Sequence, residues 1–230
     1  FHLDYFVQFV TMILIVLGAI GFPVLIEVKT FLLRKIPGFR FSLFTKITTT
    51  TYGLLFILGT VGILLVESFH SFKGMAWHEA IFSAMYHSIS TRSAGLTTYD
   101  VTTFSEASSI FMSFLMFIGA SPSSVGGGIR TTTFAIAILF LISFANGREE
   151  VQIFGRSIHL TDVFRSFVII CVALFMVLIA TMILHITEPH ATTTQIIFEI
   201  TSAFGTCGMS LGITNDLSIV GKIVVMILMF

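Results

Sequence analysis

The segment Gly119-Ala-Ser-Pro-Ser-Ser-Val-Gly-Gly-Gly128 interrupts an apolar stretch that runs from Ser105 to Asn146 and has one central charge, Arg130. As a single helix this stretch would be about 60 Å long, twice the roughly 30 Å of a bilayer's hydrocarbon core. Glycine, proline and serine in succession disfavour a continuous helix. We therefore predict a long element that is broken within a membrane. Irregular backbone at that depth persists only where it is buried in protein or lines a wet cavity.

The composition of the whole chain indicates the same environment. Of the 230 residues, 55% are hydrophobic and 10% are charged, and the mean hydropathy is +1.00. Ordinary soluble domains have about 25% charged residues, because their surfaces need charge for solubility. A soluble globular protein, a disordered chain and a nucleic-acid binder are therefore excluded. We predict an all-α integral membrane protein.

Other apolar stretches predict the remaining membrane segments. Candidate spans are Tyr5 to Val28, Leu43 to Val66, Val163 to Ile186, and one that begins at Leu217. Gly18, Gly21 and Pro23 would allow a kink or close packing in the first span. Glu79 to Ser90 and Thr193 to Phe204 have a helical pattern but are too short to cross a bilayer.

The distribution of basic residues predicts the orientation. Loop 29–46 holds Lys29, Arg34, Lys35, Arg40 and Lys46, and loop 147–165 holds Arg148, Arg156 and Arg165. Cytoplasmic loops carry an excess of Lys and Arg, so we place both loops in the cytoplasm and the protein in the cytoplasmic membrane, with several passes. The two short helices then enter from the outer side. The basic loops could also contact a cytosolic partner or anionic lipid heads.

Two units repeat the order span, outer link, half-helix, glycine loop and span. An offset of 113 places 85–96 over 198–209 and Gly95 over Gly208. The carboxyl end of a half-helix favours a cation, and glycine permits a positive φ that turns successive carbonyls toward one axis. These loops predict a cation filter built from backbone carbonyls. The residues assigned to it are Arg92, Ser93, Ala94, Gly95, Gly205, Thr206, Cys207 and Gly208.

Three segments resemble the Ktr/Trk/HKT superfamily of K⁺ transporters, and the bacterial KtrB-type membrane subunits most closely. They are Ser90-Thr-Arg-Ser-Ala-Gly-Leu-Thr-Thr98, Gly119-Ala-Ser-Pro-Ser-Ser-Val-Gly-Gly-Gly-Ile-Arg-Thr-Thr-Thr133 and Thr201-Ser-Ala-Phe-Gly-Thr-Cys-Gly-Met-Ser210. The resemblance implies four membrane–pore-loop–membrane repeats with re-entrant half-helices around one pore. Residues 1–35 would end repeat two, 36–146 would form repeat three, and 147–230 would form most of repeat four. Two filter segments cannot close a four-sided pore, so we expect a piece of a longer chain.

The resemblance also assigns a role to the break. The family has an intramembrane gating loop in the second helix of repeat three. The matching residues are Gly119, Ala120, Ser121, Pro122, Ser123, Ser124, Val125, Gly126, Gly127 and Gly128, with Arg130 just beyond them. The residues alone indicate a discontinuity, and the gating role comes from the family. Arg130 is either an interface residue or an anchor for the loop.

Potassium uptake across the cytoplasmic membrane is the function that the resemblance implies. It also implies a cytosolic, nucleotide-binding KtrA-type ring as regulator, a homodimer, and Na⁺ as a coupling or activating ion. This chain has no P-loop motif, so nucleotide would bind the partner, and we expect no organic cofactor. An enzyme is not expected, because no mid-span histidine accompanies Ser121. The alternative is a secondary transporter of a small organic solute that uses broken helices.

Two charged residues need an explanation beside a cation filter. We expect the guanidinium of Arg92 to point away from the pore onto Glu79, Asp100 or another acid. For Glu199 we favour a packing or hydrogen-bonding role over ion binding, because a carboxylate in a filter holds ions too tightly. Glu188 and His190, in the second outer link, are more simply solvated polar residues than a metal site.

Overall fold

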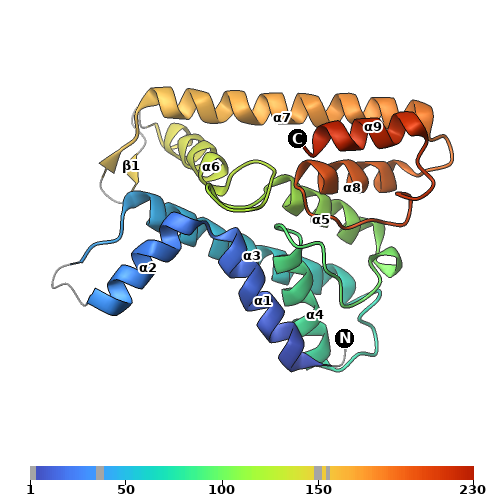
Figure 1. Cartoon of the computed structure of the whole chain (residues 1–230), viewed down its shortest axis with the longest axis horizontal. Helices are drawn as coiled ribbons and strands as arrows, with labels where there is room; N and C mark the ends of the chain where they lie inside the picture. Colours follow the sequence, from blue (N-terminus) through green and yellow to red (C-terminus); the bar gives the residue numbers. More distant parts are fainter. Residues whose placement is uncertain (1–3, 35–38, 148–151, 154–155) are drawn as a thin grey trace.

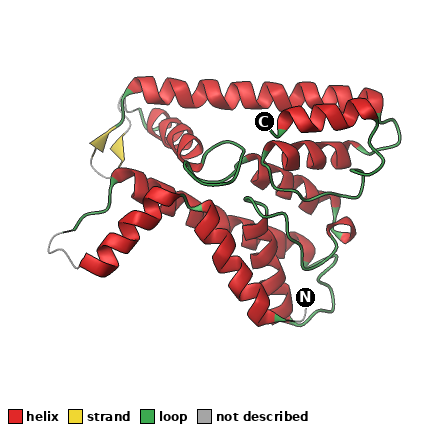
Figure 2. Cartoon of the chain, viewed as in Figure 1, coloured by secondary structure: helices red, strands yellow, loops and turns green. Residues whose placement is uncertain are grey.

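The structure is a computed structural model that describes residues 4–34, 39–147, 152–153 and 156–230, and the regular secondary structure of this part is almost entirely helical (Figure 1, Figure 2). Its α-helices are α1 Tyr5–Ala19, α2 Phe22–Arg34, α3 Leu43–Glu67, α4 Trp77–Ser90, α5 Glu106–Phe117, α6 Thr131–Ala145, α7 Leu160–Thr187, α8 Thr193–Phe204 and α9 Ile219–Leu228. A 3₁₀ turn covers Val101–Thr103, and β1 Gln152–Ile153 pairs antiparallel with β2 Arg156–Ser157. The all-α class is confirmed, apart from this short hairpin.

Two helices, α3 and α7, are long and apolar enough to cross a membrane. Each matches a predicted span to within a few residues. The predicted span 5–28 is wrong as a single element, because α1 and α2 meet at an angle of 107°. Gly21 lies at this break with φ +93°, a left-handed conformation that glycine adopts without steric cost. The predicted kink is therefore a complete break between two helices.

The other predicted break is confirmed. α5 ends at Phe117 and α6 begins at Thr131, so residues 118–130 form a non-helical segment between two short apolar helices. The half-helices are also present, as α4 and α8. In Figure 1 the links that precede α4 and α8 lie at one end of the bundle, and the start of α3 and the strands β1 and β2 lie at the other. The orientation predicted from the basic residues requires both links to lie at one end, and the side of the membrane that they face stays a prediction.

The two repeats share a contact that ties the outer end of one span to the start of the next. In the first repeat, Oε1 of the buried Glu67 accepts hydrogen bonds from the N–H and the hydroxyl of Ser105, at 2.9 and 2.8 Å. In the second, Oε1 of Glu188 accepts one from the N–H of Ser218, at 2.9 Å. Ser105 and Ser218 are the N-caps of α5 and α9 and lie 113 positions apart, like the aligned glycines Gly95 and Gly208.

A core cluster forms where α3, α4, α5 and α8 meet. Ile63, Ala84, Met112, Met116 and Phe198 are buried together there. The carboxyl ends of both half-helices are therefore held by well-packed neighbours, and the loops that follow α4 and α8 start from fixed points.

Replacing Glu67 with alanine should strongly destabilise the fold. The N–H groups of Ser105 and Ser71 would lose their acceptor, Glu67, at a buried position. We expect a loss of about 3 kcal/mol in the free energy of unfolding, seen as a lower thermal midpoint of the detergent-purified protein. The matched control is Glu106→Gln, an exposed acid in the first turn of α5, which should cost less than about 1 kcal/mol. Equal effects of the two changes would contradict this role.

Candidate ion filter and gating loop

Each half-helix ends in a turn that is bonded back onto the helix. After α4, the N–H groups of Ala94 and Gly95 both donate to the carbonyl of Ser90, at 3.2 Å each. After α8, the N–H of Cys207 donates to the carbonyl of Ser202 at 2.8 Å, and the N–H of Gly208 donates to the hydroxyl of Ser202 at 3.2 Å. Gly95 and Gly208 have positive φ angles of 64° and 95°. Both predicted filter segments therefore form tight turns of similar design.

The two turns touch one another. The Cys207 thiol donates to the carbonyl of Ser90 at 3.3 Å. A Cβ atom at Gly95 would overlap the carbonyl oxygen of Cys207, so only glycine allows this approach. The fold thus brings together two segments that are far apart in the sequence, as a shared pore requires.

Gly208 differs from Gly95 because it borders open space. A Cβ atom there would have no neighbour within 4 Å. A pocket of about 340 Å³ adjoins Gly208 and is also lined by Glu199 and Thr206. The Glu199 carboxylate accepts hydrogen bonds from the hydroxyls of Ser210, at 2.8 Å, and of Thr214. These hydrogen bonds support the hydrogen-bonding role favoured for Glu199, and they hold the chain that leaves Gly208.

The predicted gating segment packs against both filter turns. The N–H of Gly127 donates to Oγ1 of Thr206 at 2.7 Å, and the N–H of Gly128 donates to the carbonyl of Phe204 at 3.0 Å. A Cβ atom at Gly126 would lie 3.0 Å from Cβ of Ser93 and 3.2 Å from the carbonyl oxygen of Arg92. The three consecutive glycines therefore let the loop lie directly on the filter backbone.

The same segment is bonded to the break between α1 and α2. The N–H of Ser121 donates to the carbonyl of Ala19 at 3.0 Å, and the N–H of Phe22 donates to the carbonyl of Ser123 at 3.1 Å. A Cβ atom at Gly21 would lie 2.5 Å from the carbonyl oxygen of Pro122. Sequence reasoning missed this contact. Gly18 and Gly21 were its signals in the sequence, since the Cβ position of Gly18 also faces Val125 of the loop, but a glycine indicates close approach without naming the partner.

Arg130 anchors the loop from its far end. Its Nη1 atom donates to the carbonyl of Gly126 at 2.5 Å and lies 3.4 Å from that of Ser121. The hydroxyl of the next residue, Thr131, bonds to the hydroxyl of Ser121 at 3.2 Å. Of the two roles left open by the sequence, these contacts support the anchor.

Non-glycine residues with positive φ occur in both the loop and the filter. Within the described residues they are Ser123, at 59°, and Thr206, at 49°. Such conformations cost about 1–3 kcal/mol each and gather at functional sites. The surrounding hydrogen bonds to Phe22 and Gly127 hold these two residues in place.

The prediction that the Arg92 guanidinium contacts an acidic side chain is wrong. Its side chain is buried, and Nη1 donates to the backbone carbonyl of Ile118 at 3.1 Å. Among the described residues, no carboxylate lies within 4.0 Å of this guanidinium. Asp100 instead accepts a hydrogen bond from the N–H of Thr102. The carbonyl end of α5, whose dipole is negative there, replaces the acid that the sequence led us to expect.

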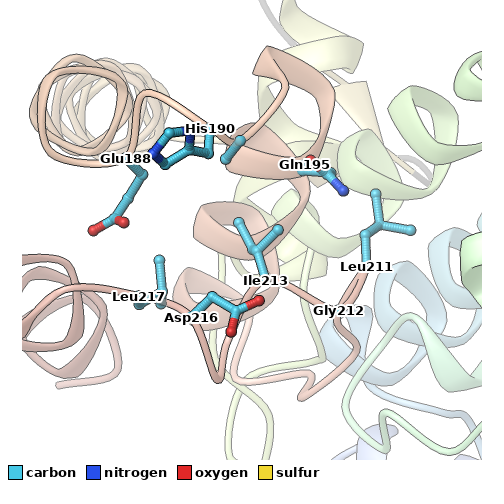
Figure 3. A pocket seen from close by; sticks show the side chains of 9 residues that line it. Glu188, His190, Gln195, Leu211, Gly212, Ile213, Asp216 and Leu217 are labelled. Atoms are coloured by element: carbon cyan, nitrogen blue, oxygen red, sulfur yellow. The ribbon is translucent and has the colours of Figure 1, made fainter.

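A polar pocket of about 320 Å³ lies at the outer end of the second repeat (Figure 3). Glu188 and His190 reach it from the link after α7, and Asp216 reaches it from the segment before α9. Hydrogen bonds from Ser218 lower the pKa of the Glu188 carboxyl, so this group is ionised at neutral pH. The described residues hold no group of three or more His, Cys, Asp or Glu side chains placed for a metal ion.

Comparison with known proteins identifies the family. A sequence model of TrkH, described as a cation transport protein, matches residues 1–230. The chain belongs to the TrkH family.

Named relatives of this TrkH-family chain are potassium uptake proteins. It is 54% identical over 230 residues to Ktr system potassium uptake protein D of Bacillus subtilis, covering 100% of this chain and 51% of the relative. It is 32% identical to Ktr system potassium uptake protein B of the same organism, covering 97% and 50%. It is also 32% identical to the potassium/sodium uptake protein NtpJ of Enterococcus hirae, covering 94% and 48%. The chain thus spans about half the length of these relatives.

A solved structure shows the same fold at low sequence identity. The crystal structure of the potassium transporter TrkH from Vibrio parahaemolyticus superposes with a TM-score of 0.72 and 16% identity. The match covers 98% of this chain and 49% of that one. At this identity the likeness supports the architecture alone.

The two filter glycines should respond differently to alanine. Gly208→Ala meets no neighbour and costs only the positive φ, about 1–2 kcal/mol. Gly95→Ala adds an overlap with the Cys207 backbone, so its loss of stability should be clearly larger. Thermal unfolding of the two purified variants, side by side, measures the difference. Equal midpoints would mean that the two turns are not in contact.

Proposed function

We propose that this chain supplies two filter segments and the gating loop of a K⁺ uptake protein in the cytoplasmic membrane. The observation that carries the proposal is the contact of two pore-loop turns with each other and with one glycine-rich loop. The relatives are named potassium uptake proteins, which supports K⁺ as the transported ion. The entry of both half-helices from one end of the bundle favours a pore over a solute transporter.

Potassium would lose its hydration water at the filter. Backbone carbonyls of residues 92–95 and 205–208 would replace that water, as in other K⁺-selective pores. α4 and α8 both end at the filter, so the negative ends of their dipoles would favour a cation there. The membrane potential would drive entry, with about 2.3 kcal/mol per charge per 100 mV.

The gating loop would block the path beneath the filter. It is bonded to Thr206 and Phe204 of one turn and lies on Arg92 and Ser93 of the other. Opening would break the Gly127–Thr206 and Gly128–Phe204 hydrogen bonds. A loop held by so few hydrogen bonds to the filter is suited to reversible movement, because each contributes only about 1 kcal/mol.

The regulatory partners are part of the same proposal. A KtrA-type nucleotide-binding ring in the cytosol, a homodimer and an effect of Na⁺ are supported by the resemblance to the Ktr branch. The name of the potassium/sodium uptake protein NtpJ gives further support for Na⁺. The half-helices and gating loop described here would respond to the ring through the cytoplasmic ends of the spans.

Ion flux tests the filter and the gate separately. In liposomes holding the full-length protein, Gly208→Ser should let Na⁺ compete with K⁺, because a side chain would enter the space beside the filter. Deletion of residues 126–128 should raise the flux of both ions, because the loop would no longer reach the filter. The measurement is ⁸⁶Rb⁺ uptake with and without competing Na⁺.

Gly74→Ser is the matched control for Gly208→Ser. Gly74 has φ +93°, has no atom within 4 Å of its Cβ position, and lies in the first outer link. The substitution Gly74→Ser imposes the same backbone strain at a site away from the filter, so the selectivity for K⁺ over Na⁺ should be unchanged. If neither Gly208→Ser nor the deletion alters flux in folded protein, the glycines only serve packing, and a solute transporter becomes the better hypothesis.

A further inference from the structure

The backbone of Arg92 belongs to the predicted filter turn, and its side chain reaches the start of the gating loop. Arg92 lies three positions before Gly95 in the predicted filter turn, and its guanidinium donates to the carbonyl of Ile118. Ile118 is the C-cap of α5, immediately before Gly119. A second contact runs through the backbone, because the Cβ position of Gly126 lies 3.2 Å from the Arg92 carbonyl oxygen. Both ends of the gating loop therefore meet this one residue.

The burial of Arg92 makes these contacts energetically important. The residue is 1% exposed, and its Nη2 atom has no hydrogen-bond partner among the described residues. A buried charge is costly unless it is paired or bonded. Here its compensation is the Ile118 carbonyl and the negative end of α5. If the loop moves and carries Ile118 with it, the guanidinium must follow or find another acceptor.

We propose that Arg92 is a positioning residue that couples the filter to the gating loop, so that the affinity of the filter for K⁺ depends on where the loop lies. The inference rests on the proposed function. The guanidinium follows Ile118, and the backbone that carries it is filter backbone. A movement of the loop therefore changes the position of filter carbonyls.

Arg130 provides a matched comparison. It also donates to backbone carbonyls of the loop, those of Gly126 and Ser121. It lies beyond the loop at the start of α6, outside both filter turns. If Arg92 couples the loop to the filter, displacing the loop by a change at Arg130 should alter the filter's affinity for K⁺ as long as Arg92 is intact.

The experiment measures two quantities on the full-length protein in liposomes. The K⁺ concentration for half-maximal uptake reports on the filter, and the uptake rate without added nucleotide or regulatory protein reports on the gate. Arg92→Gln should raise both, with about a tenfold increase in the half-maximal concentration. Arg130→Gln should also raise both quantities while Arg92 is intact, and in the Arg92→Gln background it should raise only the basal rate. Arg92→Lys keeps the charge near the end of α5 and should restore most of the K⁺ affinity.

Several results would overturn the coupling. If Arg130→Gln raises the basal rate but leaves the half-maximal concentration unchanged while Arg92 is intact, the filter does not respond to the loop through Arg92. If Arg92→Gln shifts the half-maximal concentration with an unchanged basal rate, Arg92 belongs to the filter alone. Failure of the proposed function looks different, because the folded wild-type protein would then show no K⁺ uptake at all.

A variant in the loop keeps the test decisive if Arg92→Gln fails to fold. Gly126→Ala would press on Ala120, Ser93 and the Arg92 carbonyl without changing any filter residue. We expect it to raise the half-maximal K⁺ concentration several-fold. If Arg92→Gln folds, Gly126→Ala should raise the half-maximal K⁺ concentration less in the Arg92→Gln protein than in wild type. An unchanged half-maximal concentration in Gly126→Ala, or fully additive shifts, would refute the coupling.

Discussion

Backbone hydrogen bonding inside a membrane is the constraint on which this structure depends. Residues 118–130 leave the helical pattern between α5 and α6, and in hydrocarbon each unbonded N–H or carbonyl would cost several kcal/mol. The segment meets this demand with partners from separate elements, namely Ala19 and Phe22 at the α1–α2 break and Phe204 and Thr206 at the end of α8. The hydrogen bonds of residues 118–130 thus hold the α1–α2 break and the turn after α8, a candidate filter turn, close together.

Close backbone approach explains the glycines better than flexibility does. A Cβ atom at Gly119 would overlap the carbonyl oxygen of Gly127, and the N–H of Ala120 donates to that same carbonyl. A Cβ atom at Gly205 would crowd the carbonyl oxygen of Met116. The turn after α8 and the loop between α5 and α6, our candidates for filter and gate, are thus in direct main-chain contact. Contacts of this kind transmit small displacements, because packed interiors are not compressible.

The internal repeat is preserved in contacts more than in residue identity. Glu67 bonds to the N-cap of α5 and Glu188 bonds to that of α9, although their chain separations from those caps differ. Glu67 is buried and accepts three hydrogen bonds, whereas Glu188 caps the end of α7 near a polar pocket. The same contact, a glutamate carboxylate bonded to the N–H of an N-cap serine, therefore occurs in both repeats although its surroundings differ.

The sequence by itself determined the membrane class, the two half-helices, the break between α5 and α6 and the pairing of Gly95 with Gly208. These follow from local physics, because hydropathy, segment length and glycine or proline content act over short stretches of chain. The tertiary structure alone decided that the loop lies on both candidate filter turns, that the α1–α2 break supports it, and that Arg92 bonds to Ile118 in place of an acid. Such contacts join residues far apart in the sequence through backbone atoms, which every residue carries, so no residue pattern specifies them.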